Sequence, residues 1–104
     1  MDNLVAMNID LVHKNALEAA DFLKTLSNAN RLMILCHLVG GEMCVSALEK
    51  ELDISQSALS QHLSRMRAEG LVATRRESQQ IFYRINDGRV AQLIHELYDI
   101  FCKG

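Results

Sequence analysis

The chain has 104 residues, of which 49% are apolar and 23% are charged, and its formal net charge is −2. This length fits one domain with a single small core, and we expect that domain to span residues 1–104. The sequence has neither an apolar run long enough to cross a membrane nor a secretion signal at its start, which indicates a cytoplasmic protein without a membrane partner. Its three cysteines are therefore expected to be reduced at rest.

Three helices are predicted in the first half of the chain, where apolar residues recur at helical spacing. They cover residues 10–27, 29–39 and 45–52. Gly40 and Gly41 are expected to end the second helix, because glycine commonly follows a helix C-terminus. Ser46 and Glu49 have the spacing of a capping box at the start of the third helix.

A fourth helix is predicted over residues 56–69, with Ser55 as its N-cap. One side of this helix is apolar, and the other carries hydroxyl and amide side chains instead of the lysine and glutamate usual on a solvated face. Hydroxyl and amide groups hydrogen-bond well with base edges and phosphates. The candidate DNA-contacting residues on this helix are Gln56, Ser57, Ser60 and Gln61.

A β-hairpin is predicted next, with strands over residues 71–76 and 81–86 joined by residues 77–80. Residues 55–86 carry a net charge of +3, whereas residues 1–54 carry −4. Basic side chains bind the phosphate backbone and the minor groove of DNA. The candidates for such contacts are Arg67, Arg75, Arg76 and Arg84. For each arginine the alternative is a solvated side chain or one paired within the protein.

The last helix is predicted over residues 87–102, so the order is four helices, a hairpin and a helix. The short turn between the third and fourth helices has the length found in a helix-turn-helix, and the hairpin that follows corresponds to a wing. We therefore expect a mainly α fold with a β-hairpin, the winged helix-turn-helix, which places its second helix in the major groove of duplex DNA.

Four stretches of the chain share a pattern with one known family. They are Leu-Ser-Asn-Ala-Asn-Arg-Leu at 26–32, Ser-Gln-Ser-Ala-Leu-Ser-Gln-His-Leu at 55–63, Leu-Val-Ala-Thr-Arg-Arg at 71–76 and Phe-Tyr-Arg-Ile at 82–85. These stretches resemble the ArsR/SmtB family of winged-helix repressors. The resemblance implies a homodimer held mainly by the first and last helices. It also implies an imperfect inverted repeat as operator, with one recognition helix in each half-site.

The metal sites of this family are not matched by the chain. One family site uses two cysteines before the third helix, but Ser46 replaces the second thiol here. Another uses acidic and histidine ligands on the last helix, but Arg89 stands where a histidine is expected. A single thiolate is a poor site for a soft metal. We therefore expect neither a metal nor a cofactor.

Cys36 and Cys102 are 66 residues apart. This pair resembles the branch of the family that senses persulfides and thiol oxidation. The resemblance implies that the two thiols become linked, as a disulfide or a polysulfide, and that DNA is then released. The alternative is that Cys36 is a small core residue on the apolar side of its helix and that Cys102 sits at a frayed terminus. Cys44 is expected to occupy a loop or cap position only.

The sequence therefore predicts a DNA-binding repressor, not an enzyme, whose inducers are low-molecular-weight persulfides or oxidants. Within the same class, the alternative is a metal-sensing or redox-independent regulator, including one that activates virulence genes by displacing another DNA-bound protein. A thiol enzyme would need an activating group beside Cys36, and no Cys-x-x-Cys pattern supports one. An interaction module that has lost DNA affinity is a further alternative.

Overall fold

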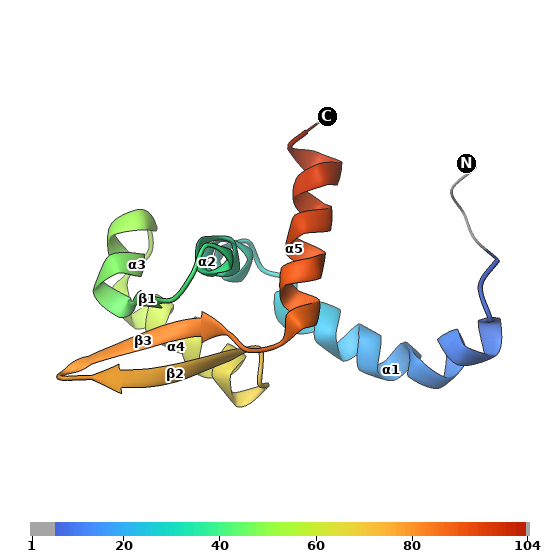
Figure 1. Ribbon diagram of the computed structural model, residues 1–104, viewed down its shortest axis with the longest axis horizontal. Helices are drawn as coiled ribbons and strands as arrows, with labels where there is room; N and C mark the ends of the chain where they lie inside the picture. The colour runs from blue at the N-terminus through green and yellow to red at the C-terminus, as the bar shows by residue number, and fades with distance from the viewer. Residues whose placement is uncertain (1–5, 104) are drawn as a thin grey trace.

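The computed structural model describes residues 6–103, which form five helices and three short strands (Figure 1). In chain order they are α1 (Ile9–Leu26), α2 (Ala29–Val39), β1 (Met43–Cys44), α3 (Val45–Glu51), α4 (Gln56–Ala68), β2 (Val72–Glu77), β3 (Gln80–Ile85) and α5 (Gly88–Phe101). The predicted winged helix-turn-helix order is confirmed, with boundaries that differ by one or two residues. Among residues 6–103, every helix is too short or too polar to span a lipid bilayer.

The ends of the helices are fixed by local side-chain hydrogen bonds. At α2, the Asn28 side chain accepts a hydrogen bond from the Arg31 backbone N–H. At α4, Ser55 Oγ accepts from the Ala58 backbone N–H at 3.1 Å, which confirms the predicted cap. Such caps satisfy amide groups that have no partner within the helix.

The predicted capping box of α3 is wrong. The N-cap of α3 is Cys44 and not Ser46. The reason is the strand β1, which pairs antiparallel with β3 through Met43 opposite Tyr83 and Cys44 opposite Phe82. This pairing keeps the chain extended up to Cys44, so Ser46 falls inside the helix. A two-residue strand has no periodicity that the sequence could reveal.

The hairpin has a tighter turn than the sequence predicts. Glu77 pairs directly with Gln80, so only Ser78 and Gln79 form the turn. Ser78 has a φ of +57°, which a non-glycine residue adopts rarely. Two-residue hairpins require such a conformation because it matches the twist of the flanking strands.

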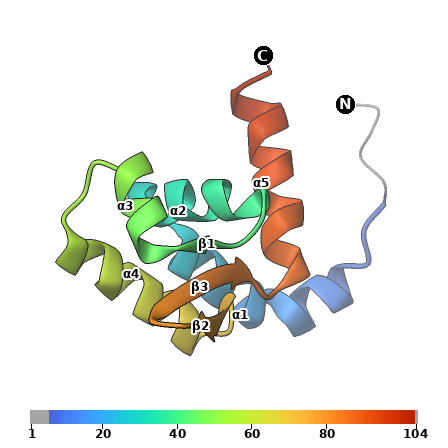
Figure 2. The ribbon, with the colours of Figure 1, turned by 60° about the vertical axis from the view of Figure 1, so that its left-hand side comes forward.

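The core lies between α2, α3, α4, the base of the hairpin and the inner side of α5. It consists of Leu26, Ile34, Leu35, Leu38, Leu48, Leu59, Leu63, Met66, Leu71, Val72, Val90 and Ile94. By contrast, α1 buries only Thr25 and Leu26, at its end. Both α1 and the outer part of α5 extend away from this body (Figures 1 and 2). They expose large apolar side chains, among them Leu17, Leu23, Ile100 and Phe101.

Candidate DNA interface and thiol groove

The second helix of the helix-turn-helix, α4, has one buried side and one polar, exposed side. Leu59, Leu63 and Met66 pack into the core. The four candidate contacts Gln56, Ser57, Ser60 and Gln61 are all exposed, and so is Arg67 in the last turn. The core thus holds α4 by its apolar side and leaves its hydrogen-bonding side free to meet a groove of DNA.

The wing tip lies beside the start of α4. Gln56 and Ser60 of α4 line one open hollow, of about 490 Å³, together with Gln79 and Gln80 of the hairpin. The start of α4 and the wing tip therefore border one hollow, whose lining also includes the apolar Val45 and Ile81 and the carboxylate of Glu49.

The C-terminus of α4 is tied to α1. The buried hydroxyl of Thr25 donates a hydrogen bond to the Glu69 carboxylate, which belongs to the C-cap residue of α4. Glu69 also forms an ion pair with Arg65 at 3.4 Å. The position of the recognition helix is therefore coupled to the helix that extends from the body.

The three wing arginines lie on two faces of the hairpin. Arg75 is opposite Phe82 and Arg76 is opposite Ile81, so the two neighbours point to opposite faces. Arg84 is two residues from Phe82 and points to the same face as Phe82. Because Phe82 is directly opposite Arg75, Arg84 and Arg75 share one face of the hairpin. All three arginines are exposed.

Arg75 is held by carboxylates of the protein. Its Nε lies 2.9 Å from both carboxylate oxygens of Glu42, and its Nη1 lies 2.6 Å from Oε1 of Glu77. The guanidinium also stacks 4.7 Å from the ring centre of Phe82. Hydrogen bonding to Arg75, with the positive charge of Arg84 nearby, holds the pKa of Glu42 below its usual range. For Arg75, one alternative given in the sequence analysis, a side chain paired within the protein, is therefore observed.

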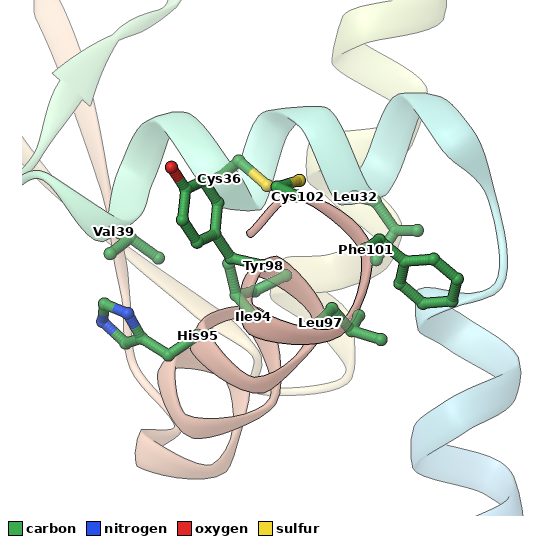
Figure 3. A pocket seen from close by; sticks show the side chains of 9 residues that line it. All are labelled: Leu32, Cys36, Val39, Ile94, His95, Leu97, Tyr98, Phe101 and Cys102. Carbon is green, nitrogen blue, oxygen red and sulfur yellow. The ribbon is translucent and has the colours of Figure 1, made fainter. Parts of the chain in front are cut away.

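Cys36 and Cys102 line one groove between α2 and α5, of about 490 Å³ (Figure 3). Both cysteines are exposed. The sequence placed Cys36 on the buried side of α2, but the buried residues there are Ile34, Leu35 and Leu38. The interpretation of Cys36 as a core residue is therefore wrong. The other groove residues are Leu32, Val39, Ile94, His95, Leu97, Tyr98 and Phe101.

The two thiols interact electrostatically. Partial burial by the groove walls raises the pKa of the Cys36 thiol, and the negative charge of a Cys102 thiolate raises it further. The second effect requires the two sulfurs to be near each other, and Figure 3 shows the two side chains close together, with Val39 and His95 to one side of them and Leu32 and Phe101 to the other. Cys102 is the C-cap of α5, and its backbone N–H donates to the Tyr98 carbonyl at 2.8 Å, so it is anchored to the helix.

Cys44 lies elsewhere, in the hollow between α4 and the wing. Its Sγ is 3.3 Å from the Ser46 hydroxyl. This hydrogen bond, followed by one with the backbone of Ala47, lowers the pKa of Cys44. The predicted cap position is confirmed, whereas the lowered pKa of this thiol was not predicted.

Residues 6–103 hold no cluster of three or more His, Cys, Asp or Glu side chains that would suit a metal ion. At the start of α5, where the family carries one of its metal sites, Arg89 instead pairs with Asp87 through Nη2 and Oδ2 at 2.6 Å. Arg89 also reaches Glu18 of α1 at 3.0 Å. This position therefore holds a fixed cation of the protein and joins α5 to α1.

Comparison with known proteins identifies the family. Residues 28–74 match the model of the bacterial regulatory proteins of the arsR family. The biofilm growth-associated repressor of Xylella fastidiosa (strain Temecula1) is 48% identical over 102 residues, which cover 97% of this chain and 90% of that protein. The chain belongs to the arsR family. Members of this family are DNA-binding transcriptional regulators and not enzymes, and they are typically dimers.

Solved structures of arsR-family regulators have the same fold. The crystal structure of the repressor BigR from Xylella fastidiosa matches with a TM-score of 0.88 at 48% identity, over 92% of this chain and 98% of that one. The transcriptional activator HlyU of Vibrio cholerae is 42% identical over 93% of this chain and 90% of its own length. The expected resemblance, fold and regulatory class are confirmed, and relatives include both a repressor and an activator.

Two features of the site were not predicted from the sequence. The partner of Arg75 is Glu42, 33 residues away, and only the tertiary fold brings them together. The lowered pKa of Cys44 depends on a backbone turn that presents Ser46 and Ala47 to one sulfur. A cysteine directly before a predicted helix was the one available signal for it, because helix N-termini favour thiolates.

Proposed function

We propose that this arsR-family protein is a homodimeric repressor that binds an inverted repeat of duplex DNA and senses persulfides or oxidants through Cys36 and Cys102. A covalent link between the two thiols lowers its affinity for the operator. One observation carries the proposal: thiols from two different helices line the same groove at the protein surface.

The DNA-binding side of the proposal relies on the polar side of α4 and on the wing. Gln56, Ser57, Ser60 and Gln61 contact bases and phosphates in the major groove, and Arg67, Arg76 and Arg84 contact the backbone or the minor groove. Arg75 contributes less as long as Glu42 and Glu77 hold it. The exposed apolar side chains of α1 and α5 provide the dimer contact.

The thiol chemistry balances without a cofactor. One cysteine thiolate attacks the terminal sulfur of a persulfide RSSH, forms a protein persulfide and releases RSH. The second thiolate then attacks the sulfur bonded to the first cysteine's Cβ, forms the disulfide and expels hydrosulfide. If both cysteines are first converted to persulfides, their condensation gives a trisulfide and H₂S. A peroxide would oxidise the two thiols to the disulfide and yield water or an alcohol.

The link acts on DNA binding through the position of α2 and α5. Helix α2 packs under the helix-turn-helix, and α5 carries part of the apolar dimer surface. A covalent bond between them changes the spacing of the two recognition helices, which must fit half-sites about one helical turn apart. A tenfold loss of affinity requires a difference of only about 1.4 kcal/mol between the reduced and linked states.

The test is operator affinity before and after treatment with glutathione persulfide, with mass spectrometry of every cysteine. A Cys44→Ser protein removes side reactions at the third thiol and serves as the parent. The treated parent is expected to carry a Cys36–Cys102 link and to bind at least about tenfold more weakly. Cys36→Ser and Cys102→Ser should bind DNA as the parent does and should not respond. A confirmed link with unchanged affinity would refute the switch.

A second candidate function is an activator that displaces another DNA-bound protein and needs no thiol change. The relative HlyU of Vibrio cholerae, described as a transcriptional activator, favours it. In transcription assays this candidate predicts that deletion of the gene lowers the target transcript. The proposed repressor predicts that the transcript rises in the deletion and on exposure to persulfide.

A further inference from the structure

The thiol groove is almost entirely apolar. Of the nine residues that line it, five are leucine, isoleucine, valine or phenylalanine, two are the cysteines, and the others are His95 and Tyr98. None is lysine, arginine, aspartate or glutamate. Two cations are next to groove residues in the chain: Arg31 precedes Leu32, and Lys103, whose Nζ pairs with Asp99 at 3.4 Å, follows Cys102. The groove lining itself therefore holds no lysine or arginine to pair with a carboxylate.

The groove is also larger than the thiol chemistry alone requires. A hydrogen peroxide or hydrogen sulfide molecule is close in size to water, which takes up about 30 Å³ in the liquid. The groove has a volume of about 490 Å³, within the range of pockets that hold small organic molecules. The groove continues to both sides of the sulfurs between α2 and α5, and Figure 3 shows Leu32 and Leu97 to one side of them and Val39 and His95 to the other.

These two properties select the organic group of an incoming persulfide. Glutathione persulfide carries two carboxylates on its peptide group, and placing a carboxylate against apolar walls without a partner is unfavourable. Burial of an alkyl or aryl group is instead favourable, because it removes apolar surface from water. The walls thus favour a substrate whose non-reacting part is apolar and uncharged.

We propose that this groove is a binding site for low-molecular-weight hydropersulfides with an uncharged alkyl or aryl group. The organic group lies against Leu32 and Leu97, and the terminal sulfur reaches Cys36 and Cys102. One cysteine thiolate takes that sulfur, and the leaving group is the apolar thiol RSH, which the groove also accommodates. This inference rests on the proposed function and specifies its substrate class.

Binding is tested without any redox step by protection from alkylation. The protein with all three cysteines is treated with iodoacetamide in the presence of benzyl methyl sulfide or S-methylglutathione. Neither of these two sulfides reacts with thiols. Benzyl methyl sulfide is expected to slow alkylation of Cys36 and Cys102 in a saturable way and to leave Cys44 unaffected, whereas S-methylglutathione protects none. Absence of protection by the benzyl compound, or equal protection by both, overturns the inference.

The reaction is tested by comparing benzyl hydropersulfide with glutathione persulfide, both generated in solution, on the Cys44→Ser protein. The rate constant for formation of the Cys36–Cys102 link is expected to be at least about tenfold higher with the benzyl compound. Leu97→Arg places a cation on the groove wall and should raise the rate with glutathione persulfide. Gln92→Arg adds the same charge to α5 outside the groove and should not.

The outcomes separate the two proposals. Equal rates with both persulfides, in a protein that does form the link, overturn the substrate class and leave the sensor intact. Protection by benzyl methyl sulfide without a link from any persulfide or oxidant supports the binding site and overturns the sensor. Circular dichroism and sedimentation of both arginine variants establish that they remain folded in the parent's oligomeric state.

Discussion

The three cysteines differ in chemical environment more than in exposure. Burial and the nearby Cys102 raise the pKa of Cys36, whereas hydrogen bonds from Ser46 and the Ala47 backbone lower that of Cys44. Because the thiolate is the nucleophile, the thiol with the lower pKa reacts faster at neutral pH. The cysteine pair proposed to sense persulfides therefore includes a thiol with a raised pKa, and the proposed binding of the substrate in the groove would compensate for it.

This difference predicts the order of alkylation. At pH 7, iodoacetamide should modify Cys44 at least about threefold faster than Cys36, measured by mass spectrometry of digested samples over time. As the pH rises, Cys44 becomes fully ionised first because its pKa is lowered, while the thiolate fraction of Cys36 continues to increase. The difference between the two alkylation rates should therefore narrow. In urea, where both environments are lost, the two rates should be similar. Faster modification of Cys36 in the native protein would contradict the assigned environments.

At the residue scale, sequence periodicity identified the buried side of α4 correctly but misjudged that of α2, where Cys36 is exposed. A helix stripe assigned from spacing alone covers about a third of the circumference, and Cys36 lies at its margin. The structure buries Ile34, Leu35 and Leu38 instead and leaves the thiol at the surface. Its proposed partner, Cys102, comes from α5 and could be paired with it only by resemblance to a family.

At the scale of single elements, the wing combines candidate DNA contacts with a cluster of charged side chains around Arg75. Glu42, just before β1, and Glu77 at the turn both hold Arg75. The sequence could predict a basic hairpin but not this pairing, because β1 is too short to be recognised. Because Glu42 lies outside residues 55–86, the net charge of that range overstates the positive charge at the surface of the wing.

Removing one carboxylate should strengthen DNA binding. In Glu42→Gln, Arg75 loses its main partner, and a negative charge near the phosphates disappears. Operator affinity at low salt is expected to rise by about two- to tenfold, and the slope of log affinity against log salt should steepen by about one. Fluorescence anisotropy across salt concentrations measures both. Glu51→Gln makes the same charge change at an exposed site at the end of α3 and should have little effect. Unchanged affinity in Glu42→Gln would show that Arg75 does not reach DNA.

The turn of the wing makes a separate prediction about stability. Ser78 holds a φ of +57°, which glycine adopts without steric cost. Ser78→Gly should therefore raise the free energy of unfolding by about 0.5 kcal/mol, after the entropy that glycine gains in the unfolded chain is subtracted. Urea unfolding at a fixed protein concentration measures it. Gln79, the second turn residue, has no positive φ, so Gln79→Gly should be neutral or destabilising. A loss of stability in Ser78→Gly would contradict this account of the turn.

At the scale of the whole molecule, the sequence could predict an amphipathic first helix but not where its apolar side would face. The stripe of Val12, Ala16, Ala19 and Leu23 is exposed, and only Leu26 beyond it enters the core. The reason is that the other helices and the hairpin already close the core around α2. An apolar stripe left outside a complete core requires a partner, and the symmetric dimers typical of this family provide a second copy of the same helix.

The exposed stripe of α1 therefore predicts that dimerisation and DNA binding fail together. Ala16 and Ala19 line a shallow apolar hollow with Leu11, Val12 and Asn15, so Ala16→Glu places a carboxylate where another helix would pack. Sedimentation should show a shift towards monomer, and affinity for the full inverted repeat should fall by at least about tenfold, because two half-sites are no longer bound by one rigid unit. Lys14→Gln makes the same change of one charge on the opposite side of α1 and should leave both properties unchanged.

Because α1 buries only Thr25 and Leu26 against its own protomer, the fold of each protomer should survive in Ala16→Glu, and the circular dichroism spectrum tests that. A variant that stays dimeric would place the dimer contact elsewhere, whereas a monomer that keeps full affinity would separate DNA recognition from dimerisation.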